Sequence, residues 1–223
     1  MGHMSNDANQ LLTSVQVNDR APVGWREVNG MLRTRLITKD FELSVRLVQE
    51  IAAAAEEADH HPDIDLRYGW VGLRLVSHDV GGITSRDVEL AGVISRLADD
   101  FEVAHAPEVT TAMTVGINTR DPERIRDFWA ALTGHTPAAH DSTSLPSPDG
   151  QLPQIWFQVT DEPGEGGPTH LDVYVPHDLA QERVDAVLAA GGRLVTDEYA
   201  PAWWVLADAD GNRACVCTWQ PHT

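Results

Sequence analysis

The sequence has little of three things: cysteine, basic side chains and long apolar runs. Two cysteines occur in 223 residues, and 16 lysines and arginines stand against 34 aspartates and glutamates, for a formal charge of −18. The absence of an apolar run of about 18 residues argues against a membrane span. The excess of acid argues against nucleic acid as a partner, because a polyanion would be repelled. We therefore expect a soluble protein whose partner is a small molecule.

The cysteines also bear on the compartment. Cys215 and Cys217 lie two residues apart on one face of a predicted strand, which is a poor geometry for a mutual disulfide. They are best interpreted as buried small hydrophobic residues. The N-terminus shows neither a basic leader nor an apolar segment of the secretory type. A reduced, cytoplasmic protein is the expectation.

The length is sufficient for two domains of ordinary size, and the hydrophobic content of 42% is that of a globular protein. A stretch of mixed composition at 102–109, containing Pro107, is predicted to be a linker, with His105 exposed to solvent. The predicted domains are accordingly residues 5–104 and residues 108–223.

The first domain is predicted to be α+β, with elements in the order α-β-α-β-α. Such an order suits helices packed on one face of an antiparallel sheet. The predicted elements are a weak helix at 5–17, a strand region at 24–38 broken by a turn at Asn29-Gly30, a helix from Asp40 that Pro62 ends, a long strand at 64–77, and a helix from Arg86 to about Phe101 capped by Thr84 or Ser85.

Three histidines lie within nineteen positions at the predicted ends of these elements. His60 and His61 are expected at the C-terminus of the second helix, and His78 at the end of the long strand. Glu56 precedes His60 by four residues, which in a helix allows the two side chains to pair. Imidazole gives and takes protons near neutrality because its ordinary pKa is about 6.5. The pattern therefore indicates a proton-transfer site.

Several motifs of the first domain occur in a characteristic order and spacing. They are Gly24-Trp25, Asp40-Phe41, Ala55-Glu56-Glu57-Ala58-Asp59-His60-His61-Pro62, Ser77-His78 and Gly82-Ile83-Thr84-Ser85-Arg86-Asp87-Val88-Glu89-Leu90-Ala91. These motifs resemble those of the pterin-4a-carbinolamine dehydratases, over nearly all of residues 8–102. This family resemblance implies dehydration of a 4a-hydroxytetrahydropterin to the quinonoid dihydropterin in pterin recycling, with no cofactor and with assembly into a homo-oligomer, a dimer or a tetramer.

The resemblance also implies roles for individual residues. His60 and His78 would handle the protons, and His61 would contact the substrate or its hydroxyl group; which of His60 and His78 is the acid stays open. The supporting residues would be Glu56 and Asp87, which orient the histidines, and Trp25 and Arg86, which help to form the pocket. A different hypothesis is that the domain is a non-catalytic module for interaction or assembly.

The second domain is predicted to contain two tandem βαβββ units. The predicted elements are strands at 111–119, 139–145, 154–159, 170–175, 193–196, 203–207 and 214–219, and helices at 122–134 and 178–190. Its notable segments are Asp121-Pro122-Glu123-Arg124, Phe128-Trp129, Thr169-His170-Leu171-Asp172-Val173, Trp204-Val205-Leu206-Ala207-Asp208, Gly211-Asn212 and Cys215-Val216. With this plan and these segments, the domain resembles the glyoxalase-like, or vicinal oxygen chelate, proteins over about residues 108–220.

Metal-using members of that second family take their ligands from the first and last strands of each unit. Only His170 falls on such a position, and Thr114, Gln158 and Cys215 lie at or near the other three. No metal is therefore expected, with His170 as a weak candidate ligand. A binding or assembly module is the favoured interpretation of this domain, and a metal-dependent lyase or dioxygenase is the alternative.

Overall fold

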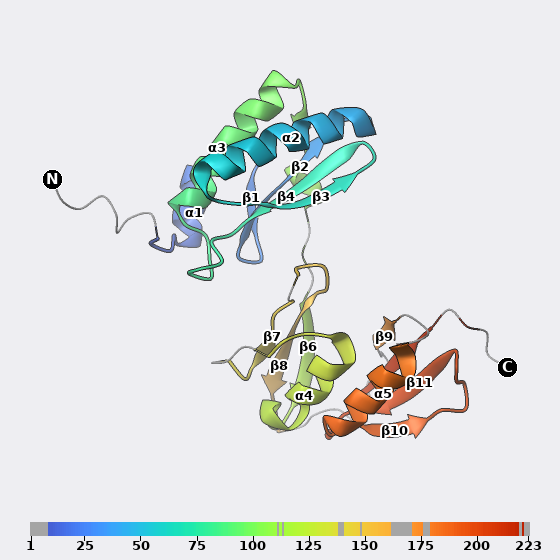
Figure 1. Ribbon diagram of the computed structural model, residues 1–223. Coiled ribbons are helices and arrows are strands. Elements are labelled where there is room, and N and C mark those ends of the chain that lie inside the picture. Colours follow the sequence, from blue (N-terminus) through green and yellow to red (C-terminus); the bar gives the residue numbers. More distant parts are fainter. Residues whose placement is uncertain are drawn as a thin grey trace. The chain divides into compact units, whose positions relative to one another are not determined.

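The computed structural model describes residues 9–110, 112, 114–137, 141–147, 149–161, 171–175, 179–218 and 220. The chain divides into two compact α+β units, Met1–Ala112 and Met113–Thr223, and each is described by itself (Figure 1). Among the helices in these ranges, none combines the length and the apolar character that crossing a bilayer requires.

The first unit is an antiparallel sheet with helices on one face, as predicted. The sheet has the order β1-β2-β4-β3, and β5 pairs with β2. The elements are α1 (Ser14–Arg20), β1 (Arg26–Val28), β2 (Met31–Ile37), α2 (Phe41–Ala58), β3 (Asp63–Arg67), β4 (Trp70–Leu75), α3 (Ser85–Asp100) and β5 (Ala104–His105).

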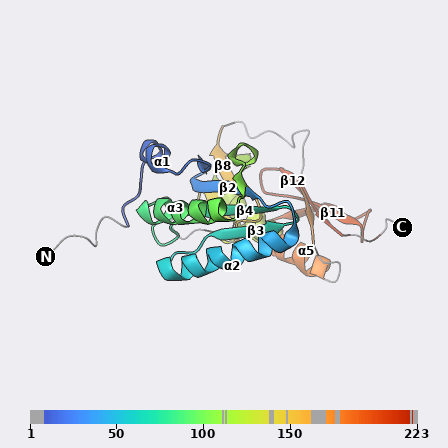
Figure 2. The ribbon, with the colours of Figure 1, turned by 90° about the horizontal axis from the view of Figure 1, so that it is seen from above.

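Alternation along the strands explains why the helices cover only one face. In β2, Leu32, Thr34 and Leu36 are buried, and the residues between them are half-buried on the opposite face. Each helix contributes to the same core: Val17 from α1, Leu47 and Ile51 from α2, and Leu90 and Ile94 from α3. Seen from above, α2 and α3 lie side by side over the sheet (Figure 2).

Three predicted elements of the first unit were wrong in their limits. The helix expected at 5–17 begins at Ser14, after its cap Thr13, and runs to Arg20. The long strand expected at 64–77 is a hairpin, because the chain reverses at Tyr68-Gly69, where Gly69 has φ of 82°. The helix expected to run to Pro62 ends at Ala58. Its C-cap residue, Asp59, is left-handed with φ of 48°, and its amide bonds back to Ala55 and Glu56. The histidines therefore follow the helix rather than belong to it.

The predicted linker at 102–109 is also wrong, because this segment packs onto the first unit. β5 pairs with β2, and a 3-10 turn, η1 (Pro107–Val109), follows it. His105 is half-buried rather than exposed, and its Nδ1 lies 2.8 Å from Thr34 Oγ1. Burial of the imidazole lowers the pKa of His105, against a smaller raising effect of Asp99.

The second unit contains two repeats with matching strand pairings. β6 runs parallel to β8 in the order β6-β8-β7, and β9 runs parallel to β12 in the order β10-β11-β12-β9. The predicted βαβββ plan is complete in the second repeat; the described part of the first repeat shows βαββ. The elements are β6 (Thr114–Thr119), α4 (Pro122–Thr133), β7 (Ser144–Leu145), β8 (Gln154–Val159), β9 (Leu171–Tyr174), α5 (Ala180–Ala189), β10 (Arg193–Thr196), β11 (Trp203–Ala207) and β12 (Arg213–Cys217).

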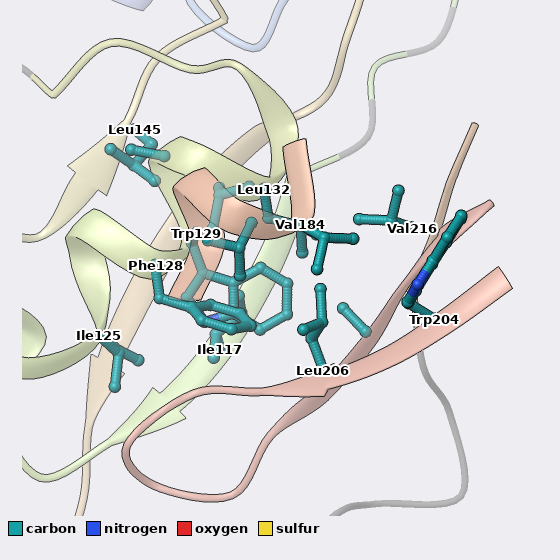
Figure 3. Close-up of a cluster of buried hydrophobic side chains, with 14 of the residues drawn as sticks. Ile117, Ile125, Phe128, Trp129, Leu132, Leu145, Val184, Trp204, Leu206 and Val216 are labelled. Atoms are coloured by element: carbon teal, nitrogen blue, oxygen red, sulfur yellow. The ribbon is translucent and has the colours of Figure 1, made fainter. Parts of the chain in front are cut away.

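One apolar core joins these two repeats. Phe128, Trp129 and Leu132 of α4 and Val184 of α5 pack with side chains from both sheets (Figure 3). Trp204 of β11 belongs to this core. Since neither repeat encloses the cluster alone, the repeats stabilise each other.

Candidate functional site

His60 is held in a buried position just beyond the end of α2. The left-handed turn at Asp59 redirects the chain, and the amide of His60 donates to the carbonyl of Ala55 at 3.1 Å. The residue is 7% exposed. Its Nε2 lies 2.8 Å from Oδ1 of Asp87, which is fully buried in the first turn of α3. The imidazole is thus fixed at one ring nitrogen.

Asp87 is surrounded by donors, which fixes its own orientation. Its Oδ2 accepts from Ser77 Oγ at 2.8 Å, from the amide of Thr84 at 2.7 Å and from Thr84 Oγ1 at 3.3 Å. The reciprocal bonds between Thr84 and Asp87 form a capping box at the start of α3. The same carboxylate therefore starts a helix and orients a histidine.

The bond between His60 and Asp87 assigns the tautomer of the imidazole. A carboxylate oxygen accepts, so the proton of this bond belongs to Nε2 of His60. Nδ1 is therefore the ring nitrogen that can exchange a proton with a bound molecule. A histidine with one nitrogen tied to a buried carboxylate has the arrangement of an oriented general acid or base.

His61 has a different environment. Its Nε2 lies 3.1 Å from Oε1 of Glu56, and the side chains are 57% and 79% exposed. The pairing expected between Glu56 and His60 was wrong: Glu56 pairs with His61, and His60 with Asp87. The reason is the left-handed residue Asp59, which removes both histidines from the helical spacing on which the expectation was based.

His78 lies in a four-residue turn after β4 rather than at the end of a strand. The turn is closed by the bridge between Ser77 and Gly82, and His78 is exposed. Because Ser77 donates to Asp87, the residue next to His78 shares the carboxylate that holds His60. The turn and the end of α2 are thus joined at one buried group.

Arg86 supports this turn. Its Nη2 lies 2.6 Å from Oδ1 of Asp79, next to His78. The hydrogen bond from Arg86 lowers the pKa of the exposed Asp79 carboxyl. Sequence reasoning gave Asp79 no role.

Trp25 lies in the core rather than in a pocket wall. It is 1% exposed, and its indole donates to Ser95 Oγ at 3.0 Å. Its predicted place in the pocket is therefore not supported by its burial. A cavity lies near Trp25, at the end of α3 opposite to Asp87, and none of His60, His61 and His78 lines it. Its lining residues are Pro22, Val23, Gly24, Arg26, Ser95, Asp99, His105 and Pro107.

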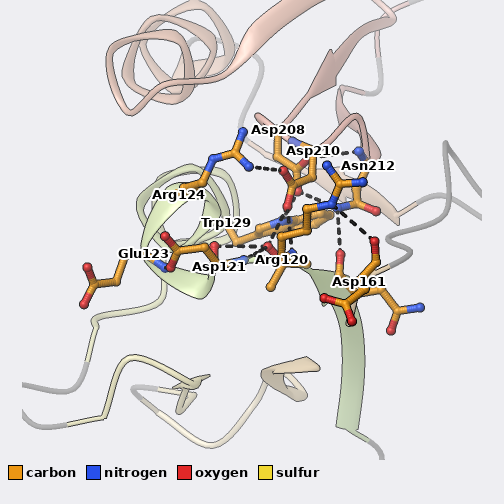
Figure 4. A network of polar contacts seen from close by, with 11 residues as sticks. Arg120, Asp121, Glu123, Arg124, Trp129, Asp161, Asp208, Asp210 and Asn212 are labelled. Carbon is orange, nitrogen blue, oxygen red and sulfur yellow. Dashed lines mark hydrogen bonds and ion pairs between the residues drawn. The ribbon is translucent and has the colours of Figure 1, made fainter. Parts of the chain in front are cut away.

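The second unit has a buried polar network of its own, built on Asp208 in the loop between β11 and β12 (Figure 4). Asp208 accepts from the indole of Trp129 at 3.0 Å and from the side-chain amide of Asn212 at 2.7 Å. It also accepts from the backbone amides of Asp210 and Asn212. These donors do not titrate near neutrality, so the network suits a structural role.

Asp210 links the same loop to the first repeat. Its carboxylate accepts from Thr119 Oγ1 at 2.6 Å and pairs with Arg124 at 2.9 Å (Figure 4). Asn212 donates to the carbonyl of Asn118 at 3.4 Å. The loop thus fastens the second repeat to the start of α4 and the end of β6.

The residues weighed as metal ligands do not form a cluster in the described part of the chain. His170 lies outside the described residues. Within them, no group of three histidine, cysteine or acidic side chains could hold a metal ion. Burial, with a smaller effect of Asp172, raises the pKa of the Cys215 thiol to about 12. The same causes raise the pKa of Cys217 to about 11, so both thiols are protonated near neutrality.

Sequence reasoning missed the part of Ser77 in the site. It quoted Ser77 and Thr84 only as parts of a motif and as a helix cap. The signal available was the capping pattern Thr84-x-x-Asp87, which places a carboxylate at a helix start. Nothing local indicated that a histidine 27 residues earlier would share that carboxylate.

The fold and the site define an α+β unit with an oriented histidine suited to proton transfer, followed by a β-rich unit of paired repeats. The family profile described as pterin 4 alpha carbinolamine dehydratase matches residues 6–97, and the profile described as glyoxalase-like domain matches residues 114–217.

A protein of Mycolicibacterium smegmatis, provisionally named as a pterin-4-alpha-carbinolamine dehydratase, is 40% identical over 92 residues, covering 40% of this chain and 98% of its own. A protein of the same provisional name from Thermosynechococcus vestitus is 44% identical over 75 residues, covering 34% of this chain and 79% of its own. The chain therefore belongs to the pterin-4-alpha-carbinolamine dehydratase family, and it carries a glyoxalase-like domain after the part that these relatives match.

Among solved structures, the transcriptional coactivator/pterin dehydratase of Brucella melitensis is similar to this chain with 28% identity. That match covers 40% of this chain and 99% of the other, with a TM-score of 0.39.

Proposed function

We propose that the first unit catalyses the dehydration of a 4a-hydroxytetrahydropterin to the quinonoid dihydropterin, as a step of pterin recycling. The observation that carries the proposal is the buried bond between His60 and Asp87, beside the turn that holds His78. The relatives' names give the substrate class.

The reaction needs two proton transfers. The carbon–oxygen bond at C4a breaks, and the hydroxyl group takes a proton and leaves as water. The neighbouring ring nitrogen loses its proton, and its electrons complete the new carbon–nitrogen double bond. One group must give a proton and another must take one, each contributing roughly 10²–10⁴-fold.

The residues of this chain suit those demands in different ways. His60, oriented through Nε2, exchanges a proton at Nδ1; His78, exposed on the neighbouring turn, is the second proton handler. His61, exposed and paired with Glu56, contacts the substrate. Asp87 is a positioning residue that acts through His60. The assignment of acid and base between His60 and His78 follows from the pH dependence of the variants.

The test is the dehydration rate of freshly generated 4a-hydroxytetrahydropterin with the full chain and with histidine variants. His60→Gln keeps an N–H that can donate to Asp87 but cannot exchange a proton. We expect His60→Gln and His78→Gln each to lower the rate about a hundredfold. His105→Gln is the matched control, since that histidine bonds Thr34 away from the site, and it should stay within about twofold of wild type.

Two results would overturn the proposal. One is a folded wild-type protein that fails to accelerate the reaction. The other is a wild-type acceleration that His60→Gln and His78→Gln both retain. The first result, joined to a defined complex with another protein in light scattering, would favour the alternative of an interaction or assembly module.

A further inference from the structure

The open face of the first unit's sheet, opposite α2 and α3, carries a row of arginines. The register of the strands places Arg26 of β1 opposite Arg33 of β2, and Arg33 opposite Arg74 of β4. Neighbouring strands lie about 4.8 Å apart. Three positive charges therefore occupy directly adjacent positions, although the whole chain has a formal charge of −18.

Such a row has a cost in stability. Like charges directly opposite each other on adjacent strands destabilise a sheet. At the centre of the row, burial and, to a smaller extent, the charge of Arg74 lower the pKa of Arg33, while Asp63 acts in the opposite direction. The next position across the sheet, on β3, is the acidic residue Asp63, whose Oδ2 lies 3.4 Å from Nε of Arg74. Folding does not require three arginines here, since half-buried positions on an open face accept many polar residues.

A fourth arginine, Arg35, lies beside the row and packs against an aromatic ring. Arg35 follows Arg33 by two residues on the same face of β2, so their Cα atoms are about 6.7 Å apart. Its guanidinium lies 4.0 Å from the ring centre of Trp70. A Cβ at Gly72, which is opposite Arg35, would meet the Trp70 ring at 3.1 Å. The glycine leaves room for the ring that supports the guanidinium.

We propose that this arginine face, defined as Arg26, Arg33, Arg35 and Arg74, is a docking surface for an extended acidic segment of a partner polypeptide. Alternate carboxylates of an extended chain are spaced about 6.7 Å apart, as are Arg33 and Arg35. Guanidinium groups bind carboxylates with paired hydrogen bonds. The charge of the face is complementary to such a segment.

The observations favour a short acidic peptide over nucleic acid. Asp63 and Asp65 lie on the same face at the edge strand, where they repel a continuous phosphate backbone. The large negative charge of the whole chain acts in the same direction. Discrete carboxylates can lie on the arginines and leave the edge strand uncovered. The residues of this surface are other than those proposed for dehydration, so either proposal can fail alone.

The test is fluorescence anisotropy of a labelled twelve-residue peptide that alternates glutamate and serine, added to the full chain. We expect binding that weakens at least tenfold as salt is raised from about 20 to 200 mM. The double variant Arg33→Gln/Arg35→Gln should lower the affinity at least tenfold. The control Arg20→Gln/Arg96→Gln removes the same charge from exposed positions on α1 and α3, and should lower the affinity less than twofold.

Arg26→Gln keeps the test decisive if the double variant does not fold, because Arg26 is exposed; we expect about threefold weaker binding. The proposal is overturned if the full chain does not bind the peptide at 20 mM salt. It is also overturned if a labelled twelve-nucleotide single-stranded DNA binds ten times more tightly. A self-association in light scattering that Arg26→Gln abolishes would assign the face to a second copy of this chain instead.

Discussion

Each unit of the molecule buries a carboxylate at the centre of a polar network, and the two networks differ in one respect. Asp87 in the first unit receives a histidine, two hydroxyl groups and a backbone amide. Asp208 in the second unit receives an indole, a side-chain amide and two backbone amides. Only the first network includes an imidazole, a side chain that can both give and take a proton. The comparison teaches that the donors, rather than the buried acid, separate a site for chemistry from a structural one.

The largest expected effect tests the structural half of this comparison. Asp208→Ala leaves the indole of Trp129 and the amides of Asn212 without their acceptor, so we expect a loss of about 3 kcal/mol or more in the unfolding free energy of the second unit. Hydrogen exchange followed by mass spectrometry over 203–217 measures it. Asp197→Ala, at an exposed position, is the control and should change little. Unchanged protection in Asp208→Ala would contradict the structural role.

Alkylation of the cysteines tests whether the second unit hides a reactive group. The raised pKa values of Cys215 and Cys217, about 12 and about 11, keep both thiols protonated at pH 8. We expect iodoacetamide to react at least a hundredfold more slowly with the folded chain than with the denatured chain, because the thiolate is the nucleophile. Mass spectrometry of the labelled peptide gives both rates. Rapid labelling of either thiol in the folded chain would show a reactive nucleophile in the second unit. The second unit would then no longer be purely structural in comparison with the first.

The third prediction tests the catalytic half, and it depends on the proposed dehydratase activity. Asp87→Asn replaces the acceptor of His60 by a group that can present a donor, so the imidazole loses its fixed orientation. We expect kcat to fall by about ten- to a hundredfold with KM within about threefold. Asp100→Asn, exposed near the end of α3, is the matched control. A loss of unfolding free energy large enough to account for the lost activity, together with a raised KM, would indicate a structural role for Asp87.

A smaller effect concerns His105, which is titratable but lies outside both networks. Its folded-state pKa is below the ordinary 6.5, so the unfolded chain binds the proton more readily. The unfolding free energy that neutral His105 contributes is therefore fully present above about pH 6.5, and it is lost as the pH falls below that value. We expect His105→Gln to flatten the decline in urea-unfolding free energy between pH 6.5 and 5. A decline identical to that of wild type would show that His105 has no part in it.

The smallest effect belongs to the exposed pair of His61 and Glu56. Both side chains are largely in solvent, where an ion pair contributes little. We expect Glu56→Gln to change the free energy of unfolding by less than about 0.5 kcal/mol in urea melts at pH 6. A loss of unfolding free energy as large as that expected for Asp208→Ala would contradict the prediction that an exposed ion pair stabilises the fold less than a buried polar network.

Local signals were sufficient for most elements. The Asp40 cap of α2, the Thr84 cap of α3 and the proline at the start of α4 each act within a few residues of their own position. The apolar periodicity then identified the strands and helices of both units. Two of the errors fell at left-handed residues, Gly69 and Asp59, where one backbone conformation split a strand and ended a helix early.

The candidate site was predictable only in part. The three histidines were identified from the sequence, and the family resemblance assigned a role to Asp87. The partner of each histidine was not predictable, because spacing along a helix favoured Glu56 for His60, and the helix had already ended. The burial of Trp25 and the packing of His105 likewise depend on contacts between distant segments.

The sequence by itself determined the family, the α+β class and the presence of three histidines, because these follow from residue types and short-range patterns. The tertiary structure decided which histidine meets a buried carboxylate, which tryptophan is core, and which arginines form one row across β1, β2 and β4. The physical reason is that burial, strand register and hydrogen bonds between distant residues exist only after the chain has packed.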